Sequence, residues 1–119
     1  MTISLNHLHV KTRDPKATAQ FCVEHLGAKM LGEIGTRGYR VDLHGLQLNI
    51  TTIIDAQKRE QSHGLEHVAV NTDEYTAMLA KLTADGVRVL EELPPGANGR
   101  RVCFLEAPDG VQIEVIEKI

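Results

Sequence analysis

Two short segments of the chain alternate hydrophobic and polar residues in the same way. Residues 5–10 read LNHLHV, and residues 65–70, sixty positions later, read LEHVAV. Alternation with a period of two is typical of a strand that buries one face. Because the second segment repeats the first, the pattern predicts a fold built from two similar halves.

Each predicted strand is followed by hydrophobic residues at helical spacing. In the first half this apolar stripe comprises Ala17, Phe21, Val23 and Leu26. In the second half it comprises Tyr75, Met78, Leu79 and Leu82. Gly27 and Gly86 stand where the two stripes end, and glycine is common just past a helix C-terminus. The spacing therefore predicts one helix after each first strand.

Three strand-like runs follow each predicted helix. They cover residues 29–34, 39–43 and 46–53 in the first half, and residues 88–92, 101–106 and 111–116 in the second. Turns rich in glycine and proline separate them. The sequence thus predicts an α+β fold of two tandem βαβββ modules that form a curved, cleft-bearing mixed sheet. We expect a single domain over residues 1–119, with module 1 at about 1–54, a polar linker at about 55–63 and module 2 at about 64–119.

Composition narrows the range of partners. Hydrophobic residues make up 42% and charged residues 24% of the chain, as in an ordinary globular protein. The formal net charge of -3 gives no electrostatic reason to bind nucleic acid or an anionic membrane, so we expect a small-molecule substrate, no nucleic acid and no membrane. The N-terminus lacks a signal-peptide pattern. Cys22 and Cys103 form no CxxC pair, so we expect buried, reduced thiols in a cytoplasmic protein.

Three polar residues stand out on the predicted strands. Residues two apart in a strand share a face, so the side chain of His7 lies opposite the hydrophobic residues of its strand. His67 holds the same position in the second half, and Glu114 lies on the polar face of the last strand. Two imidazoles and a carboxylate on rigid strands suit a first-row divalent cation and leave coordination positions open. The pattern predicts a metal centre of His7, His67 and Glu114.

Each of these residues also has a purely structural interpretation. A single histidine in a strand more often makes a hydrogen bond than binds a metal, and Glu114 alone could pair with a lysine or arginine. The coincidence at repeat-related positions favours the metal. His9 shares the face of His7, where it either orients a ligand or forms part of a polar wall with Gln47 and Gln112. The remaining histidines, expected on the surface, are His25, His44 and His63.

The paired halves and their motifs resemble the vicinal oxygen chelate superfamily, also called the glyoxalase, bleomycin-resistance and extradiol-dioxygenase fold. The resemblance rests on LNH at residues 5–7, LEH at 65–67 and FLEAPDG at 104–110. It implies a divalent metal ion (Ni, Zn, Mn, Fe or Co) bound by the first and fourth strands of each half. By position, these ligands are His7, Asn49, His67 and Glu114. A register shift of two residues would place Gln47 in the position of Asn49.

The resemblance implies several activities. Enzymes of glyoxalase I or epimerase type are metal-dependent lyases or isomerases of small substrates with neighbouring oxygens, and here Glu114 would move the proton. Lys11 stands where glyoxalase I enzymes often have an arginine for the glutathione carboxylate. A His-His-Glu site instead resembles Fe(II) extradiol dioxygenases, with His9 as the acid–base, or thiol transferases. The third alternative is a metal-free protein that binds a small molecule. Family members of this length commonly form homodimers, so the resemblance also implies a homodimer.

Overall fold

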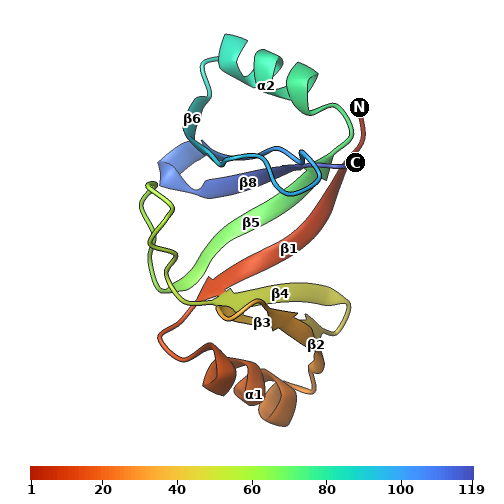
Figure 1. The fold of residues 1–119 in the computed structure, drawn as a ribbon, viewed down its shortest axis with the longest axis vertical. Coiled ribbons are helices and arrows are strands. Elements are labelled where there is room, and N and C mark those ends of the chain that lie inside the picture. The colour runs from red at the N-terminus through yellow and green to blue at the C-terminus, as the bar shows by residue number, and fades with distance from the viewer. The chain divides into compact units, whose positions relative to one another are not determined.

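The computed structural model describes all 119 residues and consists of eight strands, in one mixed sheet, and two α-helices (Figure 1). The first four strands and first helix are β1 (Ile3–Lys11), α1 (Pro15–Leu26), β2 (Lys29–Ile34), β3 (Gly38–Leu43) and β4 (Leu46–Thr51). The second set is β5 (Gly64–Thr72), α2 (Tyr75–Ala84), β6 (Arg88–Glu92), β7 (Val102–Glu106) and β8 (Gln112–Glu117), with a 3-10 turn at Pro108–Gly110. This order confirms the predicted α+β fold of two βαβββ modules.

The two sets of strands have the same internal topology. Within the first set the order is β2-β3-β4-β1, and within the second it is β6-β7-β8-β5. In each set the first strand pairs in parallel with the fourth, whereas the other pairs are antiparallel. Two strands that carry candidate ligands are therefore direct neighbours in each set.

The chain divides into two compact units. One, here called the His7 unit, consists of His7–Ala56 and Glu60–Glu66. The other, called the His67 unit, consists of Met1–Asn6, Gln57–Arg59 and His67–Ile119. The polar segment between β4 and β5 thus contributes residues to both units, and each unit is described by itself below.

In the His7 unit, α1 packs against β3 and β4. The Asp14 side chain accepts the Ala17 N–H at 3.0 Å and caps the helix, which ends at Leu26 and is followed by Gly27 with a left-handed φ of 72°. The apolar stripe predicted for this helix is wrong. Its members Ala17, Phe21, Val23 and Leu26 are all exposed. The small residues Ala19 and Cys22 face the core instead, because they let the helix approach the strands closely.

In the His67 unit, the predicted stripe of α2 is confirmed. Tyr75 is buried, and Met78, Leu79 and Leu82 pack against a core formed by Cys103, Leu105 and Val115. Burial raises the pKa of the Cys103 thiol and the pKa of the Tyr75 hydroxyl. Both cysteines are free and buried, as predicted.

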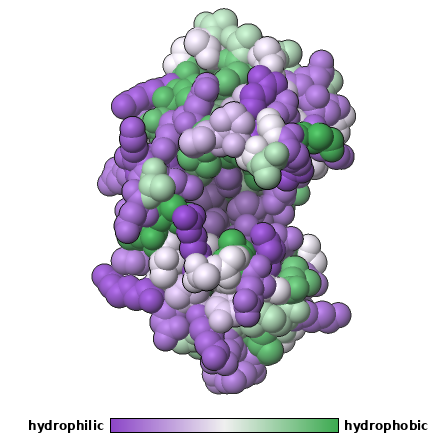
Figure 2. Space-filling model, viewed as in Figure 1, coloured by the Kyte–Doolittle hydropathy of each residue, from purple (hydrophilic) through white to green (hydrophobic).

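Several strand boundaries differ slightly from the predicted ones. β3 begins at Gly38 rather than at residue 39, β4 ends at Thr51 rather than at residue 53, and β7 begins at Val102 rather than at residue 101. β8 covers Gln112–Glu117 rather than residues 111–116. The last shift follows from the Pro108–Gly110 turn, in which Asp109 adopts a φ of 60° and delays the start of β8. No helix is both long enough and apolar enough to cross a membrane. Much of the face seen in Figure 2 is hydrophilic, and isolated hydrophobic side chains reach the surface.

Candidate metal centre

The polar face of β1 is buried. His7 is 5% exposed and His9 is 7% exposed, whereas Leu8 and Val10 point to the other side and pack against the hydrophobic core of the His7 unit. The two imidazole rings lie 5.6 Å apart between centroids, tilted by 58°. The alternation predicted for this strand is therefore confirmed, and the face that carries the histidines is the more deeply buried one.

The tautomer of His9 follows from its hydrogen bond. Nε2 of His9 lies 2.7 Å from Oγ1 of Thr51, and the Thr51 hydroxyl donates its only proton to the carbonyl of Thr52 at 2.9 Å. Thr51 Oγ1 must therefore accept from His9, which places the proton of a neutral ring on Nε2 and a lone pair on Nδ1. Nδ1 is then the nitrogen through which His9 can bind a metal or accept a proton.

Asn49 occupies the position opposite His9 in the parallel β1–β4 pair. Its Oδ1 accepts a hydrogen bond from Nε2 of Gln47 at 2.9 Å, so the two amides predicted as alternative ligands contact each other. Neither side chain carries a charge. This strand therefore offers amide groups at the place where a fourth ligand was predicted.

In the His67 unit the first and fourth strands bring an imidazole and a carboxylate together. His67 is 4% exposed, and its Nε2 donates to Oε1 of Glu114 at 3.1 Å. The Glu114 side chain is 14% exposed. A carboxylate and an imidazole nitrogen that share one proton form a pair in which a divalent cation can replace that proton. Of the predicted ligands, the structure thus joins His67 and Glu114 directly.

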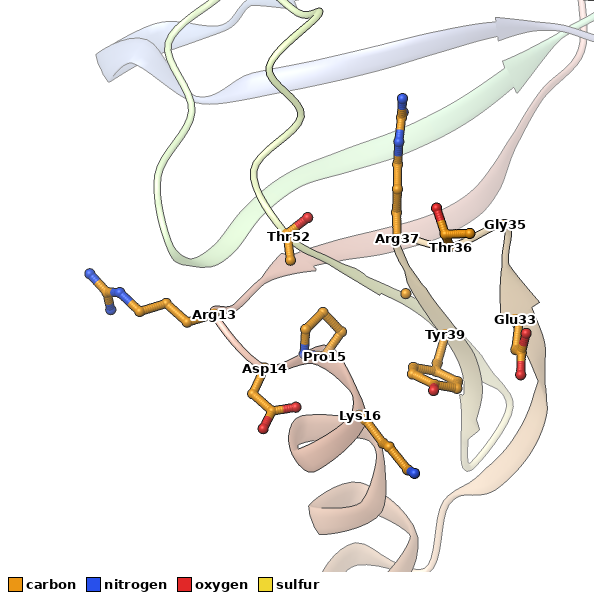
Figure 3. A pocket seen from close by; sticks show the side chains of 11 residues that line it. Arg13, Asp14, Pro15, Lys16, Glu33, Gly35, Thr36, Arg37, Tyr39 and Thr52 are labelled. Carbon is orange, nitrogen blue, oxygen red and sulfur yellow. The ribbon is translucent and has the colours of Figure 1, made fainter.

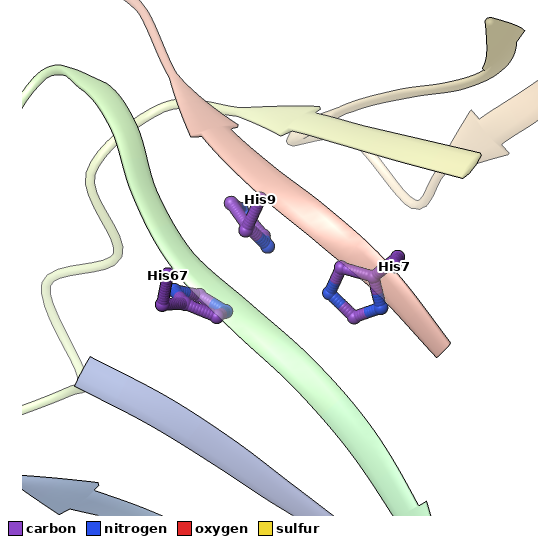
Figure 4. Close-up of side chains that lie close together, drawn as sticks. All are labelled: His7, His9 and His67. Carbon is purple, nitrogen blue, oxygen red and sulfur yellow. The ribbon is translucent and has the colours of Figure 1, made fainter. Parts of the chain in front are cut away.

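Figure 4 shows His7 and His9 on β1 and His67 on β5. Each of these side chains offers a ring nitrogen as a possible metal ligand. Buried imidazoles together with a carboxylate are the donor set that first-row divalent metals prefer. The residues present therefore fit a divalent metal ion, and His9, predicted to orient a ligand or to act as acid–base, joins the candidate ligands.

Lys11 has partners within its own unit. Its side chain is fully buried, with Nζ donating to Oε1 of Gln61 at 2.7 Å and lying 4.0 Å from Oε1 of Glu66. The resemblance placed Lys11 where it would meet a substrate carboxylate. In the structure the ammonium group donates to Gln61 and lies within ion-pair distance of Glu66.

One residue beside His67 was missed by the sequence reasoning. Arg59 is 6% exposed, and its guanidinium carbon lies 3.7 Å above the ring centroid of Phe104. The same ring makes a T-shaped contact with the imidazole of His67, with centroids 5.1 Å apart and planes at 89°. Arg59 lies in the segment that the sequence predicts to be a polar linker. The order of polar and hydrophobic residues does not distinguish a buried arginine from the exposed charged residues around it.

A separate cavity of about 320 Å³ lies in the His7 unit, at the N-terminus of α1 and the β2–β3 turn (Figure 3). It is lined by Arg13, Asp14, Pro15, Lys16, Glu33, Gly35, Thr36, Arg37, Gly38, Tyr39 and Thr52. The Arg13 and Arg37 side chains extend in different directions in Figure 3. None of the lining residues is a predicted site residue. The other three histidines, His25, His44 and His63, are exposed as predicted.

Comparisons with known proteins identify the family of this chain and its fold. The family model described as "Glyoxalase/Bleomycin resistance protein/Dioxygenase superfamily" matches residues 4–115. A probable lactoylglutathione lyase from Synechocystis sp. is 26% identical over 123 residues, covering 95% of this chain and 94% of that protein. The methylmalonyl-CoA epimerase of Mycobacterium tuberculosis has a similar structure, with a TM-score of 0.74 at 22% identity and coverage of 97% and 87%. A hypothetical protein from Bacillus halodurans C-125 has a TM-score of 0.77 at 21% identity, with coverage of 100% and 96%.

Proposed function

The chain belongs to the glyoxalase/bleomycin resistance protein/dioxygenase superfamily, and from this premise we propose that it is a divalent-metal-dependent lyase or isomerase. Its substrate is a small molecule with neighbouring oxygen atoms. A relative named as a probable lactoylglutathione lyase, which it matches over nearly its whole length, supports the lyase class, and a structural neighbour named as an epimerase supports an isomerase of the same type.

The single observation that carries the proposal is the pairing of buried His67 with Glu114 at 3.1 Å. We infer that His7, His67 and Glu114 hold the metal, with Asn49 as a fourth, weaker ligand. When bound, a divalent ion would supply Lewis-acid polarisation of the substrate oxygens. Nickel, zinc, manganese, iron and cobalt all accept nitrogen and oxygen ligands of this kind.

Residues of the chain itself would transfer protons, orient the substrate and limit the access of water. Glu114 is the carboxylate of this ligand set, so its Oε atoms can hold or move a proton, which the amide of Asn49 cannot do. Thr51 holds Nε2 of His9, so Nδ1 of the neutral ring can orient substrate or receive a proton. The near-complete burial of the imidazoles limits the access of water to them.

A turnover assay across metals tests this function. Protein purified without a histidine tag is stripped with a chelator, reloaded with each of the five metals in turn, and offered hemithioacetals of glutathione and acyl-CoA epimers. The proposal expects turnover that requires a metal and disappears on chelation. His63→Ala is the matched control, because His63 is exposed and its loss leaves the candidate ligands in place.

Two results would overturn the proposal. Turnover of catechols by the Fe(II)-loaded protein under oxygen, without any lyase or isomerase activity, would indicate a ring-cleaving dioxygenase. Failure to retain any metal, together with saturable binding of a small molecule, would indicate a metal-free binding protein.

A further inference from the structure

The polar segment between β4 and β5 is fixed to β6 through its backbone. The N–H groups of Lys58 and Arg59 both donate to Oε1 of Glu91, each at 2.8 Å. Hydrogen bonds to an ionised carboxylate are among the stronger ones in proteins. Two adjacent peptide groups held by one oxygen leave Arg59 little freedom, so its side chain leaves the backbone in a defined direction.

The side chain of Arg59 is held at three places. Nη1 donates to Oε1 of Gln112 at 2.7 Å, Nη2 donates to Oε1 of Gln57 at 2.9 Å, and the guanidinium lies over the Phe104 ring at 3.7 Å. A planar guanidinium can stack on a ring and donate in its own plane at the same time, which an ammonium group cannot. These contacts define both the position and the plane of the guanidinium.

Two of the three contacts lead directly to candidate metal ligands. Phe104 is paired with Glu114 across β7 and β8, and its ring makes a T-shaped contact with His67. Gln112 is paired with His67 across β5 and β8, and it precedes Glu114 by two residues on the same face. Arg59 therefore fixes one neighbour of each ligand.

We propose that Arg59 is a positioning residue for the metal centre. By holding the Phe104 ring and the Gln112 amide, it sets the ring orientation of His67 and the place of Glu114. The consequence for metal affinity rests on the proposed function, whereas the orientation of His67 does not depend on a metal. The two parts can therefore be tested separately.

The variants are chosen to remove single properties of Arg59. Arg59→Met keeps most of the apolar stem but removes the charge and the donors, and Arg59→Lys keeps the charge but not the planar fork. Arg101→Met is the matched control. Arg101 also lies over an aromatic ring, that of Tyr75 at 4.6 Å, and pairs with Glu117 in the same unit, but none of these residues is a candidate ligand.

The deciding measurement is the imidazole ¹H–¹⁵N spectrum of metal-free protein, with the His67 signals assigned from a His67→Gln variant. In the wild type we expect His67 to show one tautomer, protonated at Nε2 towards Glu114. Arg59→Met and Arg59→Lys should show a mixture of tautomers or broadened signals, whereas Arg101→Met should match the wild type. Thermal unfolding of each variant, followed by circular dichroism, verifies that the compared proteins are folded.

The second measurement is the dissociation constant for Mn(II) or Zn(II), by competition with a chromophoric chelator. Both Arg59 variants should bind about 10–100-fold more weakly than the wild type and Arg101→Met about equally, as for other residues that orient ligands. An unchanged His67 spectrum in folded Arg59→Met overturns the positioning role, whatever the metal affinity. If the wild type binds no metal, the proposed function fails, while the imidazole spectra still decide the role of Arg59.

Discussion

The fourth strands of the two modules, β4 and β8, have the same place in the topology but different chemistry. On β4, Asn49 accepts a hydrogen bond from Gln47, and both side chains are neutral. On β8, Glu114 accepts a hydrogen bond from the buried imidazole of His67. The repeat therefore supplies similar scaffolds twice, whereas the acidic group of the candidate centre comes from one module alone. Two strands of one chain can thus share a topology and differ in the chemical groups that they present.

Replacing the carboxylate of β8 by an amide, as on β4, should cause the largest loss of activity. Glu114→Gln keeps the shape of the side chain but removes the carboxylate, and we expect activity to fall by about 10²–10⁴-fold, the usual contribution of an acid–base group. Steady-state kinetics with the best substrate and metal measure the loss. Glu106→Gln is the control, because Glu106 is an exposed glutamate in the same unit. Retention of activity in Glu114→Gln would show that the two strands do not differ in function.

The loss of metal affinity should differ among the three histidine variants. His7→Ala and His67→Ala remove proposed ligands and should weaken metal binding by more than about 100-fold, while His9→Ala should cost about 10–100-fold, as loss of an orienting partner does. Isothermal titration with one metal compares the three variants, with His25→Ala as an exposed control. An equal loss in His9→Ala and His7→Ala would make His9 a full ligand.

Placing a carboxylate on β4, as on β8, should produce a smaller change, an increase in metal affinity. Asn49→Glu adds an anionic oxygen at the predicted fourth position and should tighten metal binding by about tenfold, which corresponds to about 1.4 kcal/mol. Asn49→Gln extends the side chain equally without the charge and serves as the control. If both variants bind the metal like the wild type, the Asn49 position does not reach the ion.

The smallest expected effects are changes in the free energy of unfolding caused by substitutions on the two helices. Because Phe21 is 55% exposed, Phe21→Ser on α1 should change the free energy of unfolding by no more than about 0.5 kcal/mol. Leu79 packs against the core of the His67 unit, so Leu79→Ser on α2 should cost more than about 1 kcal/mol. Urea denaturation measures both. A large loss in Phe21→Ser would restore the apolar stripe that the sequence predicts for α1.

Local patterns predicted most of the fold. The alternation around His7 and His67 identified the first strands, and Gly27 and Gly86 marked the helix ends, because these signals depend on neighbours along the chain. The exposed face of α1 could not be predicted in this way. Which face packs depends on how closely the helix must approach the strands, and that favoured the small residues Ala19 and Cys22 over larger hydrophobic ones.

The candidate site shows the same division. The burial of His7, His9 and His67 and the bond to Glu114 agree with the faces deduced from the period of two. Arg59 could not be found, because its contacts with Phe104 and Gln112 join residues about fifty positions apart. The ligand set, the module boundaries and the homodimer stay predictions from the sequence.

Metal retention by the untagged protein tests the central claim most directly. Protein loaded with each divalent metal is dialysed against metal-free buffer, and bound metal is measured by inductively coupled plasma mass spectrometry for the wild type and for a His67→Ala/Glu114→Gln double variant. The account predicts about one ion per chain in the wild type for at least one metal and almost none in the double variant. Equal retention by the two proteins, or none by either, would contradict it.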